Sequence, residues 1–315
     1  MSLSRLGYTL LLYALVPRAL LHLWWRARRQ PEYREHWGER FGRYFGPAPK
    51  PLIWIHAVSV GETRAAAPLI HELRRRYPKH RILLTHMTPT GRDTGLSLFG
   101  DTVERCYLPY DFPFAVARFL THFKPVCGVL LETEIWPNLI HACRVRQIPI
   151  YLVNARMSEK SRRGYARFKR FAAACLNELS GIAAQSRADS ERLQSLGAAT
   201  ITVTGNLKFD ITPDPALVER GANWRQEWGR ARPVLLCAST REGEEALLLD
   251  ALREFDVRDA LILIVPRHPQ RFDEVAAIIE SAGITYQRRT SGAPIDAATR
   301  IVLGDSMGEM FAYYG

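Results

Sequence analysis

The sequence predicts an α/β protein with two Rossmann-like domains, each built around a mostly parallel sheet. From Leu52 to Lys208, apolar runs typical of buried strands alternate with amphipathic stretches typical of helices, and this alternation favours parallel strands joined by helices. The same alternation starts again at Pro233, after a looser stretch. Polar groups recur where the apolar runs end, which is where open α/β sheets bind ligands.

The chain begins with an apolar segment that is followed directly by arginines. Its uninterrupted part, Leu6–Pro17, is shorter than the roughly 20 residues that a membrane-spanning helix needs. The Trp24-Trp25 pair and the arginines suit the headgroup boundary of a membrane. We therefore predict a membrane anchor or interfacial helix at 1–29, with the following residues on the cytoplasmic side; a helix buried against the protein body is the alternative. A basic connector is expected at 30–51.

The first Rossmann-like domain is expected at 52–208. Its strand candidates are Leu52–Ser59, Arg81–Thr88, Val103–Tyr110, Val126–Thr133, Ile148–Asn154, Gly181–Gln185 and Ile201–Thr204. Its helix candidates are Glu62–Tyr77, Gly91–Phe99, Pro113–His122, Pro137–Arg146, Ser161–Leu179 and Arg187–Leu196.

A linker is expected at 209–232, because prolines interrupt it, and a second Rossmann-like domain at 233–315. The strands expected there are Pro233–Ser239, Ala260–Val265 and Arg300–Leu303, and the helices are Glu242–Glu254 and Arg271–Ser281. Three strands are too few for a doubly wound sheet. We therefore expect the second domain to be incomplete.

Composition narrows the classes of partner. The 43 Lys and Arg residues exceed the 32 Asp and Glu residues, giving a net charge of +11 and a pI near 9.7, which suggests anionic partners. The arginines do not cluster on an aromatic-bearing element, so nucleic acid is disfavoured. The five cysteines form no CxxC pair, as expected for core residues in a reducing compartment. Walker, GxGxxG and metal-binding patterns are missing from the sequence.

The junction Ser59-Val60-Gly61-Glu62 ends the first strand and begins a helix. Gly61 is expected to supply a close turn, and Glu62 to lie in the first helical turn. Glu62 is the first candidate for chemistry because ligands collect at the carboxyl ends of parallel strands. An acidic residue there is also common simply because it offsets the helix dipole. The helix terminus should lower the pKa of Glu62 and burial should raise it, and the sequence leaves this competition open.

Other polar groups follow the remaining strands. They are Glu132–Pro137, Asn154-Ala155-Arg156, Gly205–Asp210, Ser239–Glu244, Pro266–Pro269 and Gly304–Glu309. Taken singly, they are also explained by helix caps, rigid turns and solvated charges. Together they favour an interdomain site in which Lys208, Arg267 and the helix starts after Thr240 and Ser306 receive phosphate.

Seven motifs in order, HAVSVGE, LLETEIWPN, NARMS, GNLKFD, ASTREGEE, PRHPQRF and GDSMGEM, closely resemble the 3-deoxy-D-manno-octulosonic acid (Kdo) transferases of lipopolysaccharide synthesis. The resemblance covers nearly the whole chain. It implies an inner-membrane-associated glycosyltransferase of the GT-B fold, with two Rossmann-like domains facing a cleft. The implied reaction moves Kdo from CMP-Kdo to the lipid A precursor, lipid IVA, without a cofactor or metal. The implied partners are these two substrates and the anionic lipids of the inner membrane.

By position, the resemblance makes Glu62 the general base and gives Glu132 and Lys208 a role in stabilising the transition state. Arg241 stands where the family motif has His. The expected substrate- and CMP-binding residues are Ser59, Gly61, Ser239, Thr240, Arg241, Arg267, His268, Met307, Gly308 and Glu309. Family members continue past Gly315 with further nucleotide-binding segments. The rival hypothesis is a membrane-tethered nucleotide- or polyanion-binding protein without catalytic activity.

Overall fold

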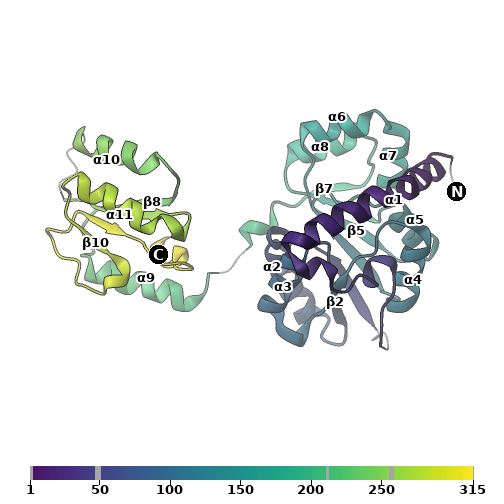
Figure 1. The fold of residues 1–315 in the computed structure, drawn as a ribbon, viewed down its shortest axis with the longest axis horizontal. Helices are drawn as coiled ribbons and strands as arrows, with labels where there is room; N and C mark the ends of the chain where they lie inside the picture. Colours follow the sequence, from purple (N-terminus) through teal and green to yellow (C-terminus); the bar gives the residue numbers. More distant parts are fainter. Residues whose placement is uncertain (1–2, 47–50, 211–212, 255–258, 315) are drawn as a thin grey trace. The chain divides into compact units, whose positions relative to one another are not determined.

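The computed structural model describes residues 3–46, 51–210, 213–254 and 259–314. The chain divides into two compact units, Met1–Ile211 (unit 1) and Thr212–Gly315 (unit 2). Each unit has its own parallel sheet and its own apolar core (Figure 1). The predicted α/β class is confirmed.

All seven strands expected in unit 1 are present and form one parallel sheet. They are β1 (Leu52–His56), β2 (Arg81–His86), β3 (Glu104–Tyr107), β4 (Cys127–Leu131), β5 (Ile150–Ala155), β6 (Gly181–Ala184) and β7 (Ile201–Val203). Their order in the sheet is β3-β2-β1-β4-β5-β6-β7, so the direction of winding reverses between β1 and β4. The carboxyl ends of these two strands flank the point where open α/β sheets bind ligands.

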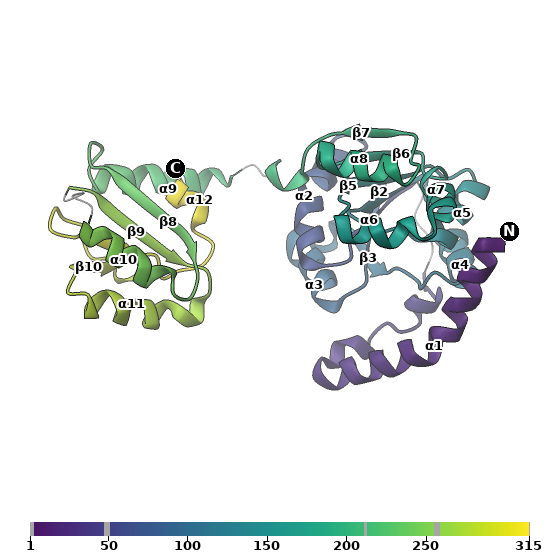
Figure 2. The ribbon, with the colours of Figure 1, turned by 90° about the horizontal axis from the view of Figure 1, so that it is seen from above.

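Helices cover both faces of this sheet (Figure 2). They are α2 (Val60–Arg76), α3 (Pro89–Phe99), α4 (Pro113–Phe123), α5 (Pro137–Val145), α6 (Glu159–Ala166), α7 (Lys169–Leu176) and α8 (Arg187–Ser195), with short 3-10 turns η3 (Gly100–Thr102) and η4 (Leu207–Phe209). Leu52 and Trp54 pack in the cluster under α4 and α5, whereas Ile53 and Ile55 pack under α2 and α3. The single helix expected at 161–179 is two helices, because Phe168 leaves the helical conformation.

Helix α1 (Leu3–Arg29) runs continuously through Pro17 along the outside of unit 1 (Figures 1 and 2). It is fixed to the body by polar contacts: Arg5 forms two hydrogen bonds with Glu178, at 2.8 and 2.9 Å. Tyr8 donates to Asp111 at 3.1 Å. Within the described ranges, no helix combines the length and the apolar composition needed to cross a membrane.

The expected connector folds onto unit 1 through the 3-10 turns η1 (Pro31–Arg34) and η2 (Glu39–Phe41). Arg40, one of its basic residues, is only 1% exposed. The Arg40 guanidinium donates to the carbonyl of Met87 at 3.2 Å and lies 4.0 Å from the ring centre of Tyr107. This part of the connector is therefore structural, and residues 47–50 lie outside the described residues.

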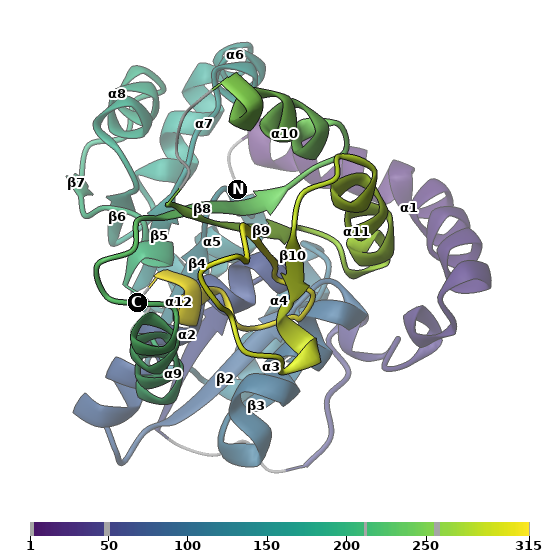
Figure 3. The same ribbon diagram turned by 90° about the vertical axis from the view of Figure 1, so that its left-hand side faces the viewer.

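Unit 2 has a four-stranded parallel sheet in the order β10-β11-β9-β8. Its strands are β8 (Val234–Thr240), β9 (Leu261–Pro266), β10 (Tyr286–Arg288) and β11 (Ile301–Leu303). Its helices are α9 (Pro215–Glu227), α10 (Glu244–Glu254), α11 (Phe272–Ser281) and α12 (Met310–Tyr314), with turns η5 (Pro269–Arg271) and η6 (Arg289–Ser291). Helices α10 and α11 cover one face, and α9 and α12 cover the other (Figure 3).

Two expectations for this region need correction. The sequence predicts three strands, but β10 is a fourth, missed because Tyr286–Arg288 has no apolar run. The sequence also assigns 209–232 to a linker, whereas α9 lies inside that range and belongs to unit 2. The physical reason is packing, because Trp228, which follows α9, joins Tyr313 in the unit 2 core.

Candidate functional site

Glu62 lies at the carboxyl end of β1, in the first turn of α2. Ser59 is the residue at the N-cap position, and the Glu62 side chain folds back over the strand end. Glu62 Oε2 accepts from the main-chain N–H of Val58 at 2.8 Å, and Oε1 accepts from Ser59 Oγ at 3.1 Å. This arrangement is close to a capping box, in which a carboxylate in the first turn binds a free N–H. The fold therefore fixes the orientation of the carboxylate.

The close turn expected at Gly61 is wrong. Gly61 lies within the first turn of α2 and does not adopt the left-handed backbone conformation. A Cβ at this position would meet only Ser59 Oγ, at 4.0 Å. The residues before Val60 make the turn, because Ser59 is extended and α2 starts directly after it.

Two further carboxylates follow β4, beside β1. Glu132 takes a left-handed backbone conformation, with φ of 59°, and redirects the chain after the strand. Glu134 Oε2 accepts a hydrogen bond from Trp136 Nε1 at 2.8 Å and lies 4.0 Å from His56 Nε2. The charge of Glu132 raises the pKa of Glu62, and the charge of Glu62 raises the pKa of Glu134. Glu62, Glu132 and Glu134 therefore form one group, which we call the carboxylate cluster.

Lys208 reaches this cluster from η4. Its Nζ lies 3.8 Å from Glu132 Oε1, and its side chain is half exposed. Asn154, at the carboxyl end of β5, accepts from the main-chain N–H of Leu207 at 3.1 Å through Oδ1. Asn154 thereby fixes the turn that carries Lys208. Asn154 has a left-handed backbone conformation, with φ of 54°. Asn is one of the residues that tolerate this conformation.

Burial decides the competition over the pKa of Glu62. Desolvation raises this pKa and is the largest effect; the hydrogen bond from Val58 opposes it, and the charge of Glu132 adds to it. The net shift is upward. Burial also raises the pKa of Glu134 to about 7, with the charge of Glu62 acting in the same direction. A raised pKa brings a carboxylate closer to the value that suits a general base.

His56 was not singled out from the sequence, and Glu134 was named only as a member of the polar group that follows the fourth strand. Both lie inside quoted motifs, HAVSVGE and LLETEIWPN. Their positions could have indicated a functional role. His56 ends β1 and Glu134 follows β4, the two strands between which the winding of the sheet reverses. Burial lowers the pKa of His56 to about 3, so its imidazole is neutral.

The site residues expected in unit 2 meet at the carboxyl edge of its sheet. Thr240 ends β8, and its carbonyl accepts from the main-chain N–H of Arg267 at 3.0 Å, just after β9. Arg267 and His268 are exposed. Met307 and Gly308, also exposed, follow β11, the strand on the other side of β9. The sheet order therefore places these positions side by side at one edge.

The two helix starts expected to receive phosphate lie beside acidic side chains. Helix α10 begins at Glu244, and the main-chain N–H of Arg241 donates to the Glu244 carboxylate at 2.8 Å. Ser239 takes a left-handed φ of 60° before this turn. Helix α12 begins after Glu309, whose carboxylate is nearly buried and accepts from Arg289 at 2.6 Å. A carboxylate of the chain therefore binds a main-chain N–H just before α10, whereas the Glu309 carboxylate before α12 binds the Arg289 side chain.

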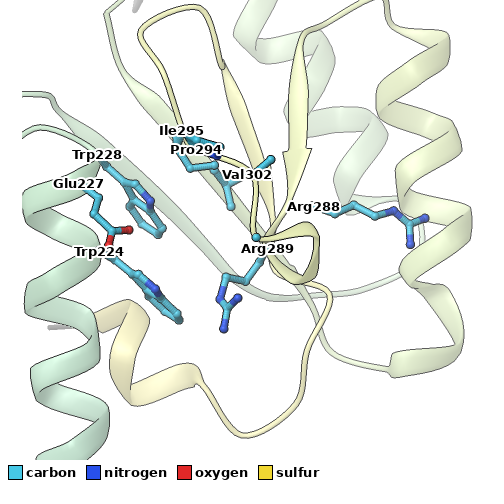
Figure 4. A pocket seen from close by; sticks show the side chains of 10 residues that line it. Trp224, Glu227, Trp228, Arg288, Arg289, Pro294, Ile295 and Val302 are labelled. Carbon is cyan, nitrogen blue, oxygen red and sulfur yellow. The ribbon is translucent and has the colours of Figure 1, made fainter.

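Unit 2 also contains a cavity of about 480 Å³ that the sequence did not predict (Figure 4). Trp224 and Trp228 line one side, with parallel rings 5.7 Å apart. Arg289 lines the other side, with its guanidinium 4.6 Å from the ring centre of Trp224. Arg289 also binds Glu309, so the cavity adjoins the segment predicted to bind CMP.

Across the described ranges, no group of three or more His, Cys, Asp or Glu side chains is arranged to hold a metal ion. The roles of the individual site residues stay predictions.

Comparison with known proteins identifies relatives over nearly the whole chain. A family model described as 3-deoxy-D-manno-octulosonic-acid transferase (kdotransferase) matches 35–211. The 3-deoxy-D-manno-octulosonic acid transferase of Bordetella pertussis is 44% identical, over 98% of this chain and 74% of that protein. The transferase of the same name from Haemophilus influenzae is 37% identical, over 99% of this chain and 74% of that protein.

Among solved structures, the UDP-GlcNAc 2-epimerase of Neisseria meningitidis bound to UDP-GlcNAc is similar in fold. The TM-score is 0.53 at 15% identity, with 84% of this chain and 74% of that chain covered. At this identity the likeness concerns the fold alone, which is of the GT-B type with two Rossmann-like units.

Proposed function

Because the chain belongs to the 3-deoxy-D-manno-octulosonic acid (Kdo) transferase family, we propose that it transfers Kdo from CMP-Kdo to lipid IVA, the lipid A precursor. Glu62 is the general base in this proposal. The observation that carries it is the Glu62 carboxylate, fixed at the carboxyl end of β1 beside the switch point of the sheet. Catalytic carboxylates are most effective when their position is fixed before the substrate binds.

The chemical step requires a base on the acceptor side. A sugar hydroxyl oxygen of the acceptor forms a bond to the anomeric carbon of Kdo, while the bond from that carbon to the CMP oxygen breaks. The hydroxyl proton passes to Glu62, and the bonding electron pair leaves with CMP. This single displacement inverts the anomeric centre. General-base catalysis of this kind contributes about 10²–10⁴-fold to the rate.

Cations stabilise the negative charge that develops on CMP. Lys208, beside Glu132, is the candidate from unit 1, and Arg267 is the candidate from unit 2. Arg267 is exposed at the carboxyl edge of the unit 2 sheet, where it can bind phosphate. His268, Met307 and Gly308 are proposed to bind the nucleotide at the same edge.

The acceptor is a lipid, which calls for a membrane surface beside the site. Helix α1 is attached to unit 1 by polar residues, and several of its leucines and tryptophans are exposed. We propose that this face lies on the cytoplasmic surface of the inner membrane and contacts anionic lipids. The net charge of +11 supports such a contact.

The test is a transfer assay with radiolabelled CMP-Kdo and lipid IVA on the wild type and Glu62→Gln. The substitution keeps the shape of the side chain and removes its basicity. We expect it to retain CMP-Kdo binding and to lower transfer by about 10²–10⁴-fold. Glu72→Gln is the matched control, because Glu72 lies on the same helix in an exposed ion pair with Arg75.

Two results would contradict the proposal. Near wild-type transfer by Glu62→Gln removes Glu62 from the mechanism. Binding of CMP-Kdo without transfer by the wild type supports the rival hypothesis of a binding protein.

A further inference from the structure

Glu134 has surroundings that the proposed base mechanism does not use. Its Oε2 accepts from Trp136 Nε1 at 2.8 Å and lies 4.0 Å from His56 Nε2. Its side chain is mostly buried. His56 is fully buried, and its Nε2 has no hydrogen-bond partner among the residues that the structure describes. A buried polar atom without a partner is costly, so this contact requires an explanation.

The other ring nitrogen determines the tautomer of His56. His56 Nδ1 lies 3.1 Å from the main-chain oxygen of Thr85 and 2.9 Å from Thr85 Oγ1. A carbonyl oxygen can only accept a hydrogen bond, so Nδ1 carries the proton and donates it. Thr85 Oγ1 also accepts from Trp54 Nε1 at 2.8 Å. In a neutral imidazole, Nε2 then presents a lone pair toward Glu134.

An ionised Glu134 would also present only lone pairs to this nitrogen. Two acceptors facing each other 4.0 Å apart in a buried site repel, whereas a proton on Glu134 makes the contact attractive. We propose that Glu134 is a positioning residue that keeps a proton and directs it toward Nε2 of His56, so that Glu62 is the carboxylate that stays ionised. This inference deepens the proposed function and rests on it for the role of Glu62.

The surrounding charges support this assignment. Burial, the largest cause, and the charges of Glu62 and Glu132 together raise the pKa of Glu134 to about 7, against the opposing hydrogen bond from Trp136. The titratable groups that face Glu134 are Glu62 from α2, Glu132 from its own loop, His56 from β1 and Tyr165 from α6. Lys208 pairs with Glu132, at 3.8 Å. The acidic groups among them disfavour another negative charge.

A neutral Glu134 affects donor binding. CMP-Kdo carries a phosphate and a carboxylate, and an additional negative charge in the carboxylate cluster would repel it. Above the pKa of Glu134, its ionisation would also break the contact with His56. The wild-type kcat/KM for CMP-Kdo should therefore fall as pH rises through about 7.

Glu134→Gln tests the proposal because its amide is uncharged at every pH, as the protonated carboxyl is. Its oxygen can keep the hydrogen bond from Trp136, but because Oε2 faces both Trp136 and His56, the amide cannot also donate to His56 Nε2 from that position. We expect kcat/KM at pH 7 to stay within about tenfold of the wild type, and the decline at alkaline pH to disappear. Glu134→Ala leaves Trp136 Nε1 without its acceptor and removes the carboxyl that faces His56 Nε2, and we expect a loss of more than about tenfold.

Two results would overturn the proposal. If Glu134→Gln loses as much transfer as Glu62→Gln, Glu134 acts as an ionised or proton-transferring group and the proposal is wrong. Retention of the wild-type alkaline decline in Glu134→Gln also overturns it.

A second measurement does not depend on activity. Long-range ¹H–¹⁵N spectra of the imidazole groups, assigned with His56→Gln, report which nitrogen of His56 carries the proton. We expect the Nδ1–H tautomer in both the wild type and Glu134→Gln. An Nε2–H tautomer would overturn the inference even if transfer follows the proposed function. Failure of the wild type to transfer Kdo would overturn the proposed function and leave this spectral test valid.

Discussion

Three side chains from separate elements define the chemistry proposed for unit 1. Glu62 is fixed by its own strand end, Glu134 by Trp136, and Lys208 by the turn that Asn154 holds. Burial is the largest contribution to the raised pKa of both Glu62 and Glu134. The two carboxyls differ in their partners, since main-chain and hydroxyl donors favour the ionised form of Glu62.

Lys208→Met should change both the rate and its pH dependence. The charge of Lys208 lowers the pKa of Glu62, so its removal raises that pKa. A general base must be deprotonated to act. The pH below which transfer is lost should therefore be higher in Lys208→Met than in the wild type. Loss of a cation near the developing charge should also lower kcat by about 10²-fold. Steady-state kinetics across pH measure both effects.

Lys208→Arg is the control for this prediction because it keeps the positive charge. We expect its acid limb to coincide with that of the wild type. An unshifted acid limb in Lys208→Met would show that Lys208 does not act on the base.

Helix α1 has an unusual distribution of polar and apolar residues. Its polar residues Arg5, Tyr8 and Thr9 bind the protein body, while apolar side chains face outward. Exposed apolar residues that share one helical face are typical of helices that lie in a membrane interface. Arg28, on the same face, lies 3.7 Å from the ring centre of Trp24, which suits the headgroup region.

We expect the triple variant Leu6→Ser, Leu10→Ser and Leu21→Ser to lose membrane binding. These side chains are 46%, 60% and 65% exposed and lie on one helical face. Burial of each leucine in a membrane contributes about 1.5–3 kcal/mol, so vesicle partitioning should fall by more than about 10²-fold. Flotation with vesicles containing anionic lipid measures this.

Leu247→Ser is the matched control, since Leu247 is 72% exposed on α10 of unit 2. Its partitioning should equal that of the wild type. Deletion of Met1 to Arg29 should likewise move the protein toward the soluble fraction. Unchanged flotation of the triple variant would exclude α1 as the membrane contact.

At the scale of the whole molecule, two sheets with separate cores support two sets of site residues. The core of unit 2 contains a buried ion pair. Arg271 donates to both oxygens of Glu245, at 2.9 and 3.0 Å, and the Glu245 side chain is 0% exposed. Burial alone would raise the pKa of Glu245, but the hydrogen bonds from Arg271 hold it below its usual value.

Arg271→Met should destabilise unit 2 by about 3–5 kcal/mol because it leaves a buried carboxylate unpaired. Hydrogen exchange in the full chain should accelerate in β8, β9 and α10 and stay unchanged in the unit 1 sheet. The pKa of Glu245 is lower in the folded state than in the unfolded state, where it is about 4.3, so the ion pair stabilises unit 2 fully above that pH. This stabilisation is lost as the pH falls through the folded-state pKa. The difference between variant and wild type should therefore shrink below about pH 4.

Arg75→Met, in an exposed pair with Glu72 on α2, is the control and should change stability by less than about 1 kcal/mol. Wild-type exchange rates in unit 2 of Arg271→Met would contradict the assigned role of the buried pair.

Local patterns in the chain were sufficient for most of the fold. Alternating strand and helix patterns predict every strand of the unit 1 sheet and the strands β8, β9 and β11 of unit 2. Each of these elements has an apolar pattern that its own residues display. Strand β10 and helix α9 were missed or misassigned because their placement depends on distant partners, among them β11 and Tyr313.

The sequence by itself determined the α/β class, the transferase motifs and the location of Glu62 at a strand end, because periodicity and strand-to-helix junctions are local properties. Only the tertiary structure decided that Glu134 faces His56 and that Lys208 lies beside Glu132. Those contacts depend on strand order and on side-chain direction. The upward pKa shift of Glu62 was likewise decided by burial, which exists only when the sheet, helices and turns pack together.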